Sequence, residues 1–151
     1  MFNVKQFRSA RFVARTADID LSGSGLAEFF QEGSPPVWKV RGLTGEEMAI
    51  CRQDRRDAIA ARDIMGQIRA RAEAQGAEEH VQALAVLSKT MSDGVPDDHA
   101  LYLSYVQHGS VAPVCPREMA VKLAANFPVE FMAIAHKILE LTGLGTICEK
   151  K

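Results

Sequence analysis

The chain has few of the sequence features that mark a catalytic or metal-binding protein. Its three cysteines, Cys51, Cys115 and Cys148, are scattered and form no CxxC pair, which argues against a disulfide framework and against a zinc knuckle. No GxSxG, phosphate-loop or GxGxxG motif occurs, and the four histidines stand in no HExxH spacing. These absences favour a binding or assembly role over catalysis.

A charge excess and long apolar runs are also missing. The 18 basic and 19 acidic residues give a net charge of −1, whereas a protein that binds nucleic acid usually has a basic excess. No run approaches the roughly 20 apolar residues of a membrane span, and no secretory apolar segment occurs. We therefore expect no nucleic-acid or membrane partner, no cofactor, no metal, and a cytoplasmic location with reduced cysteines.

The length and the apolar content suit an ordinary soluble protein with one core. The chain has 151 residues, of which 47% are hydrophobic. We predict a single domain over residues 1–151. Within it we expect a β-containing part at 1–43, a helical body at 44–145 and a flexible tail at 146–151.

The N-terminal part has two interpretations. Residues 1–17 hold four basic residues and no acid, as an organellar transit peptide would. We favour the alternative, in which Phe7 to Leu21 begins the domain as extended chain, because "FVARTADIDL" continues without a cleavage-like break. "ADIDL" alternates as a strand does, and "VWKV" at 37–40 is a second strand that can pair with it. We expect Trp38 on that strand to be buried.

A long helix follows the second strand. Thr44 and Glu47 form a T-x-x-E capping box, and helical periodicity continues to about Ala74. Asp54 and Asp57 interrupt the apolar stripe of this helix. Either the start of the helix projects beyond the core, or the two acids face a partner or a basic neighbour. They are the candidate partner-binding residues.

The remaining chain is mostly helical by its periodicity. Gly76 marks a break, and "LAEFF" at 26–30 is either a helical turn or a second extended piece. Gly143 fits a left-handed residue that ends the last helix. The predicted fold class is mainly α, with about five helices and a small N-terminal antiparallel β element. The later helices are expected at 77–91, 97–108, 117–127 and from Pro128 through Leu141, with extended chain at 110–116.

Three sets of residues allow a chemical or a structural interpretation. "DDH" at 97–99 could ligate a metal, but aspartate at a helix start is explained by capping and the helix dipole. Cys115 could be an exposed thiol, although no histidine lies near it in sequence. Tyr102 and Tyr105 with Phe127 could form an aromatic contact surface, and their helical spacing favours the core instead.

Several stretches together resemble a known family. "FVARTADIDL" followed by "PVWKVRGLTGEEMA" is similar to the N-terminal part of phage tail assembly chaperones, and "PREMAVKLAANFP" with "EFMAIAHKILELTGLG" is similar to their later helices. The fold-defining positions that match are Trp38, Arg41, Gly42, Leu43, Thr44, Phe127, Leu141, Thr142 and Gly143. By this resemblance the tryptophan pins the β element on the helices, and Gly42 permits a tight turn into the capped helix.

The resemblance implies a cytoplasmic factor of a phage or prophage that is absent from the finished virion. Such a factor holds the tape measure protein soluble, aids tail tube protein assembly, tends to self-associate and has no catalytic residues. Many members of the family are made in two lengths through a ribosomal frameshift, so the Glu149–Lys151 ending is either encoded by a slippery sequence of this kind or is a plain solvated tail. The alternatives are a helical regulatory or antitoxin-like binding module and a small enzyme subunit that uses residues such as Asp97, His99 and Cys115.

Overall fold

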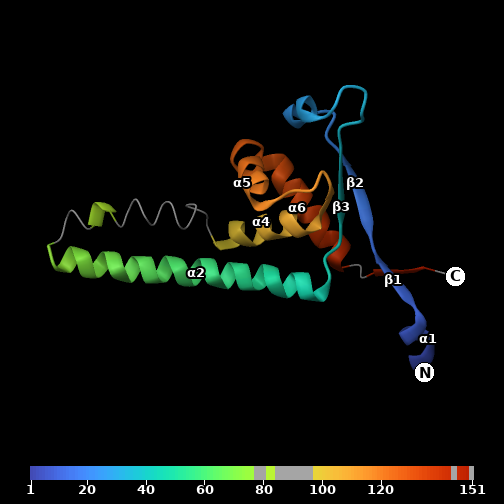
Figure 1. Ribbon diagram of the computed structural model, residues 1–151, viewed down its shortest axis with the longest axis horizontal. Coiled ribbons are helices and arrows are strands. Elements are labelled where there is room, and N and C mark those ends of the chain that lie inside the picture. Colours follow the sequence, from blue (N-terminus) through green and yellow to red (C-terminus); the bar gives the residue numbers. More distant parts are fainter. Residues whose placement is uncertain (77–80, 84–96, 144–145, 150–151) are drawn as a thin grey trace. The chain divides into compact units, whose positions relative to one another are not determined.

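The computed structural model describes residues 1–76, 81–83, 97–143 and 146–149 (Figure 1). The chain divides into two compact units, Met1–Met48 with Leu103–Lys151, and Ala49–Tyr102. The sequence predicted one domain with a division near residue 43. The first unit instead joins the two ends of the chain, because C-terminal helices pack on N-terminal strands. The single-domain organisation stays a prediction.

A three-stranded antiparallel sheet organises the first unit, with the order β2-β3-β4. The strands are β2 (Thr16–Asp20), β3 (Val37–Arg41) and β4 (Ser110–Ala112). In the β2–β3 pair Ile19 lies opposite Trp38, so apolar side chains gather on one face of the sheet. The predicted strands and their pairing are confirmed, whereas β4 was expected only as extended chain.

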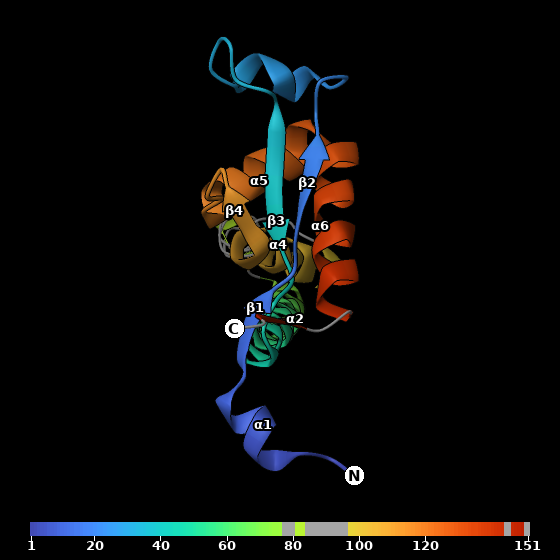
Figure 2. The ribbon, with the colours of Figure 1, turned by 90° about the vertical axis from the view of Figure 1, so that its right-hand side faces the viewer.

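Helices α5 (Arg117–Asn126) and α6 (Pro128–Gly143) pack on each other, and α6 also packs on β2 and β3 (Figure 2). Phe131, Ile134 and Ile138 of α6 are fully buried. Their i, i+3, i+7 spacing places them along one side of the helix, as the periodicity predicted. The fold class, mainly α with a small antiparallel β element, is confirmed.

Trp38 joins the strands to one another. Its side chain is only 2% exposed, which confirms the predicted burial. The indole Nε1 donates a hydrogen bond of 3.0 Å to Oγ of buried Ser110 on β4. Because a buried indole N–H needs an acceptor, this bond fixes the orientation of the ring and connects β3 to β4.

Gly42 allows the turn after β3 to approach the end of α6 closely. A Cβ atom at Gly42 would lie 2.9 Å from the carbonyl carbon and oxygen of Leu141. The φ angle of Gly42 is not positive, so the close approach to α6, and not a left-handed backbone, is what requires glycine here. The predicted tight turn into the capped helix stays a prediction. Next to it, the Leu43 amide donates to Thr142 Oγ1 at 2.8 Å, and that hydroxyl donates to the carbonyl of Ile138 at 2.7 Å.

The predicted capping box begins helix α2 (Gly45–Ala74). The Glu47 amide donates to Thr44 Oγ1 at 3.2 Å, and the Thr44 amide donates to Glu47 Oε2 at 2.9 Å. The Arg41 guanidinium adds two hydrogen bonds to the same carboxylate, at 2.6 and 2.9 Å. These bonds from Arg41, reinforced by the Thr44 amide, lower the pKa of Glu47 to about 2.

The second unit contains most of α2 and the first half of α4 (Asp97–Gly109). Gly76 has a φ of 68°, which confirms the predicted break after the long helix. The helix predicted at 77–91 lies largely outside the described residues, although residues 81–83 are helical. Within this unit Arg55 and Asp98 form an ion pair of 2.9 Å.

The two ends of the chain differ from their predictions. The chain was predicted to be extended from Phe7 onward, but Phe7 to Ser9 belong to helix α1 (Val4–Ser9). Asn3 caps this helix by accepting a hydrogen bond from the Gln6 amide. Strand β5 (Thr146–Glu149) pairs antiparallel with β1 (Arg11–Ala14). The prediction of a flexible tail is therefore wrong for these four residues, because backbone pairing needs no side-chain periodicity.

The end of α6 also differs from its prediction. Gly143 is the last helical residue and has no positive φ, so the expected left-handed cap at this position is wrong. The hydrogen bond that the Thr142 hydroxyl donates to the carbonyl of Ile138 lies within this last turn of α6. Leu144, the residue after Gly143, lies outside the described residues.

Candidate functional site

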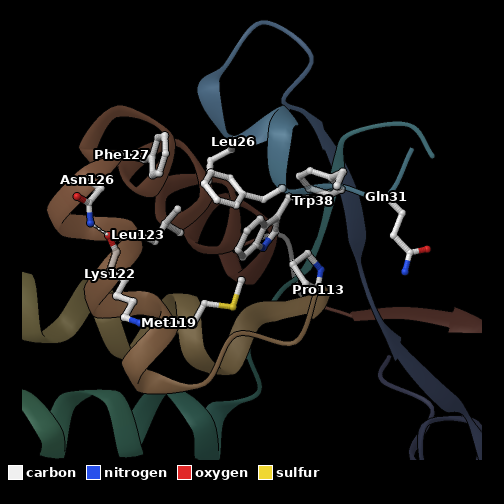
Figure 3. A pocket seen from close by; sticks show the side chains of 11 residues that line it. Leu26, Gln31, Trp38, Pro113, Met119, Lys122, Leu123, Asn126 and Phe127 are labelled. Carbon is white, nitrogen blue, oxygen red and sulfur yellow. Dashed lines mark hydrogen bonds between the residues drawn. The ribbon is translucent and has the colours of Figure 1, made fainter. Parts of the chain in front are cut away.

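An apolar cleft of about 670 Å³ opens in the first unit (Figure 3). Its walls come from the short 3-10 helix η1 (Gly25–Phe29) with the two residues after it, from β3, from the chain after β4, and from α5 with its C-terminal cap. The lining residues are Leu26, Phe29, Phe30, Gln31, Trp38, Pro113, Met119, Lys122, Leu123, Asn126 and Phe127. This size and lining are typical of binding sites for apolar ligands or side chains.

The first wall depends on a capped turn. Ser24 Oγ accepts a hydrogen bond of 3.0 Å from the Leu26 amide and so begins η1. Leu26 is buried, whereas Phe29 on the same turn is 76% exposed. The ring of Phe29 meets that of Phe127 edge to face, with 6.1 Å between centroids. The two rings therefore form an aromatic edge that joins η1 to the end of α5.

Trp38 forms the floor of the cleft. Figure 3 shows its indole near the centre of the labelled side chains, with Met119 and Pro113 beside it. Since the indole N–H already donates to Ser110, the ring offers only carbon surface to an occupant. The flexible thioether of Met119 can adjust to an aromatic or aliphatic group placed there.

Helix α5 supplies the opposite wall and the only ionisable side chain of the lining. Met119, Lys122, Leu123 and Asn126 recur at spacings of three and four, so they share one helical face. Asn126 Nδ2 donates to the carbonyl of Lys122 at 2.8 Å. The Lys122 side chain is exposed and forms no ion pair with another described residue. The cleft is therefore apolar and has one ammonium group at its edge.

The residues with possible chemical roles in the sequence do not line this cleft. No group of three or more His, Cys, Asp or Glu side chains that could hold a metal occurs among the described residues. Cys115, predicted as a possible exposed thiol, is fully buried, and burial raises its pKa to about 11. His99 is half-buried at the start of α4, where burial lowers its pKa, and the side chain of Asp97 lies outside the described ones.

The two candidate partner-binding residues chosen from the sequence lie elsewhere. Asp54 and Asp57 are on α2 in the second unit, where Asp54 is half-buried and exposed Asp57 accepts from Gln53 Nε2 at 2.7 Å. Of the aromatic set, Tyr105 is only 5% exposed and belongs to the core. Phe127 does line the cleft. A partner-binding role for the two aspartates stays a prediction.

Sequence reasoning missed the first wall of the cleft. The stretch "LAEFF" was predicted only as a helical turn or an extended piece, and it contributes Leu26, Phe29 and Phe30. The available signal was two adjacent phenylalanines in a short segment between glycine- and proline-rich loops. These two rings belong to no periodic apolar face of a long helix or strand, and in the structure they line the cleft.

Comparison with known protein-family models, curated proteins and solved structures finds no match to this chain. In the part of the chain that the structure describes, no helix is both long enough and apolar enough to traverse a lipid bilayer.

Proposed function

We propose that this protein is a phage or prophage tail assembly chaperone that binds apolar segments of the tape measure protein and aids tail tube assembly. Two arguments support the proposal. The first is the sequence resemblance over the strand-to-helix corner at 37–48 and the later helices. The second, which carries the binding role, is the apolar cleft with the exposed ring of Phe29 at its edge.

A chaperone of this type must offer apolar surface to water before its partner arrives. Soluble monomers rarely expose contiguous apolar patches, and those that do commonly use them for interaction. Burying an exposed phenylalanine such as Phe29 against a partner contributes about 1.5–3 kcal/mol to the free energy of binding. Several anchors of this size in one cleft are sufficient for reversible capture of an apolar segment.

Capture of the tape measure protein tests the function. The chain is co-expressed with the tape measure protein encoded near its gene, and the complex is isolated by affinity capture. Phe29→Asp places a charge in the cleft and should reduce capture at least about tenfold. Val129→Asp is the matched control, because Val129 is also 76% exposed and does not line the cleft.

Three results contradict the proposal. One is equal capture by the two variants, and another is a tape measure protein that stays soluble without the chaperone. The third is a gene neighbourhood without phage tail genes. A toxin gene next to the gene of this protein would favour the antitoxin-like alternative instead. The enzyme alternative has less support, since the Cys115 thiol is buried and protonated at neutral pH.

A further inference from the structure

The shape of the α5 wall indicates what can lie in the cleft. Met119 and Leu123 lie on an i, i+4 row, which is a helical ridge, and Phe127 extends it to i+8 at the C-terminal cap. Ridges with this spacing pack into the grooves of another helix. The facing wall, Leu26 to Phe30, is a short turn, so a groove remains between the two walls.

The exposure of the lining residues argues against a fully enclosed ligand. Phe29, Lys122 and Asn126 reach solvent, whereas Leu26, Trp38 and Leu123 are buried. An occupant would therefore have one apolar side against Trp38 and one side in water. An amphipathic helix has this character, whereas an alkyl chain gains most when its whole surface leaves water.

The charge at the edge of the cleft adds a further requirement. Lys122 is the only ionisable residue of the lining, and its ammonium has no acidic partner among the described residues. A carboxylate on the polar side of the occupant would find this ammonium at the boundary between the cleft and water. A cation at the same position would be repelled.

We propose that the cleft binds an amphipathic α-helix of a partner protein, with its apolar face against Trp38 and a carboxylate near Lys122. The inference rests on the proposed function only in taking the cleft as the partner site. Apolar contacts supply most of the affinity. The exposed charge pair supplies selectivity, which we expect to be about two- to fivefold between acidic and neutral helices.

Synthetic helices measure this selectivity directly. The probes are stapled peptides without tryptophan that carry leucine at i, i+3, i+4 and i+7. One glutamate is moved along the polar side from peptide to peptide, and glutamine and lysine versions are made at each place. A dye on the peptide terminus reports binding through its fluorescence anisotropy, because Trp38 is already only 2% exposed before an occupant arrives.

The expected order of affinity at the best position is glutamate, then glutamine, then lysine. Lys122→Glu should reverse this order, and Lys122→Gln should abolish the preference while leaving the apolar affinity. Lys122 is exposed, so both variants should retain the circular dichroism spectrum of the wild type. Lys5→Glu makes the same charge change outside the cleft and should keep the original order.

Several outcomes overturn the inference. The first is that no peptide binds, and the second is that Lys122→Glu leaves the order of affinity unchanged. The third is that dodecanoate binds more tightly than every peptide in competition. The fourth is that the protein self-associates and a second copy fills the cleft. If peptides fail while tape measure capture still depends on Phe29, this inference alone is wrong. If peptides bind in the expected order while capture fails, the proposed function is wrong and the inference stands.

Discussion

Replacing Glu47 by glutamine tests the role of the strand-to-helix corner in stability. Glutamine retains the shape of the side chain and can take the same place in a capping box, but it carries no charge. The change therefore removes the electrostatic attraction to Arg41. Because an amide has a single acceptor oxygen, it also removes one of the two hydrogen bonds that Arg41 donates to the carboxylate, at 2.6 and 2.9 Å. The rest of the corner is left in place.

The size of the effect follows from the pKa of Glu47. The fall in the pKa of Glu47 from 4.5 to about 2 corresponds to roughly 3 kcal/mol of stabilisation of the folded state before screening by solvent is considered. The side chains of Glu47 and Arg41 are 21% and 29% exposed. Screening by solvent therefore reduces the expected loss to about 1–2 kcal/mol. Because the folded-state pKa is depressed, this stabilisation is complete above about pH 4.5 and is lost as the pH falls towards about 2.

Urea denaturation of both proteins at several pH values measures this difference. At pH 7 we expect Glu47→Gln to unfold more readily by about 1–2 kcal/mol, and near pH 2 the two proteins should have the same free energy of unfolding. Glu46→Gln is the control, because Glu46 is exposed and loses only its interaction with the helix dipole, up to about 0.5 kcal/mol. The reasoning is refuted if Glu47→Gln and the wild type have the same free energy of unfolding at pH 7. It is also refuted if the difference between them at pH 7 persists unchanged at pH 2.

Two further substitutions test the first unit. Gly42→Ala should cost about 1–3 kcal/mol in thermal denaturation, because its Cβ would lie 2.9 Å from the Leu141 carbonyl. Gly45→Ala has open space at its Cβ and should be neutral or slightly stabilising, so equal effects of the two would contradict the close-approach explanation. Trp38→Phe removes the donor to Ser110 and should cost about 1–3 kcal/mol. Wild-type tryptophan emission typical of a water-exposed indole would contradict its burial.

Local patterns in the sequence predicted the parts of the fold that depend on near neighbours. The capping box at Thr44 and Glu47 needs only residues three apart, and the structure has both of its hydrogen bonds. The buried stripe of α6 repeats at helical spacing, and Phe131 and Ile138 are fully buried on it. Trp38 could be assigned to a buried strand because the residues around it alternate.

Pairings between distant segments could not be predicted in this way. Strand β5 depends on backbone hydrogen bonds to β1, with Arg11 opposite Glu149, and "TICE" has no pattern that identifies such a partner. Gly42 illustrates the same limit. The sequence indicated that glycine matters at this corner, but only the position of Leu141 explains that the space for a side chain is missing.

The cleft shows a different limit, which concerns function. An apolar helical stripe identifies the face of a helix that avoids water, but it does not say which molecule covers that face. The apolar residues of α5 include Met119, Ala120, Leu123 and Ala124. In the structure Ala120 is fully buried, whereas Met119 and Leu123 border the cleft beside exposed Lys122. One helix thus supplies both core residues and a wall of the cleft, and Lys122 lies where the core ends and where we propose that a partner binds.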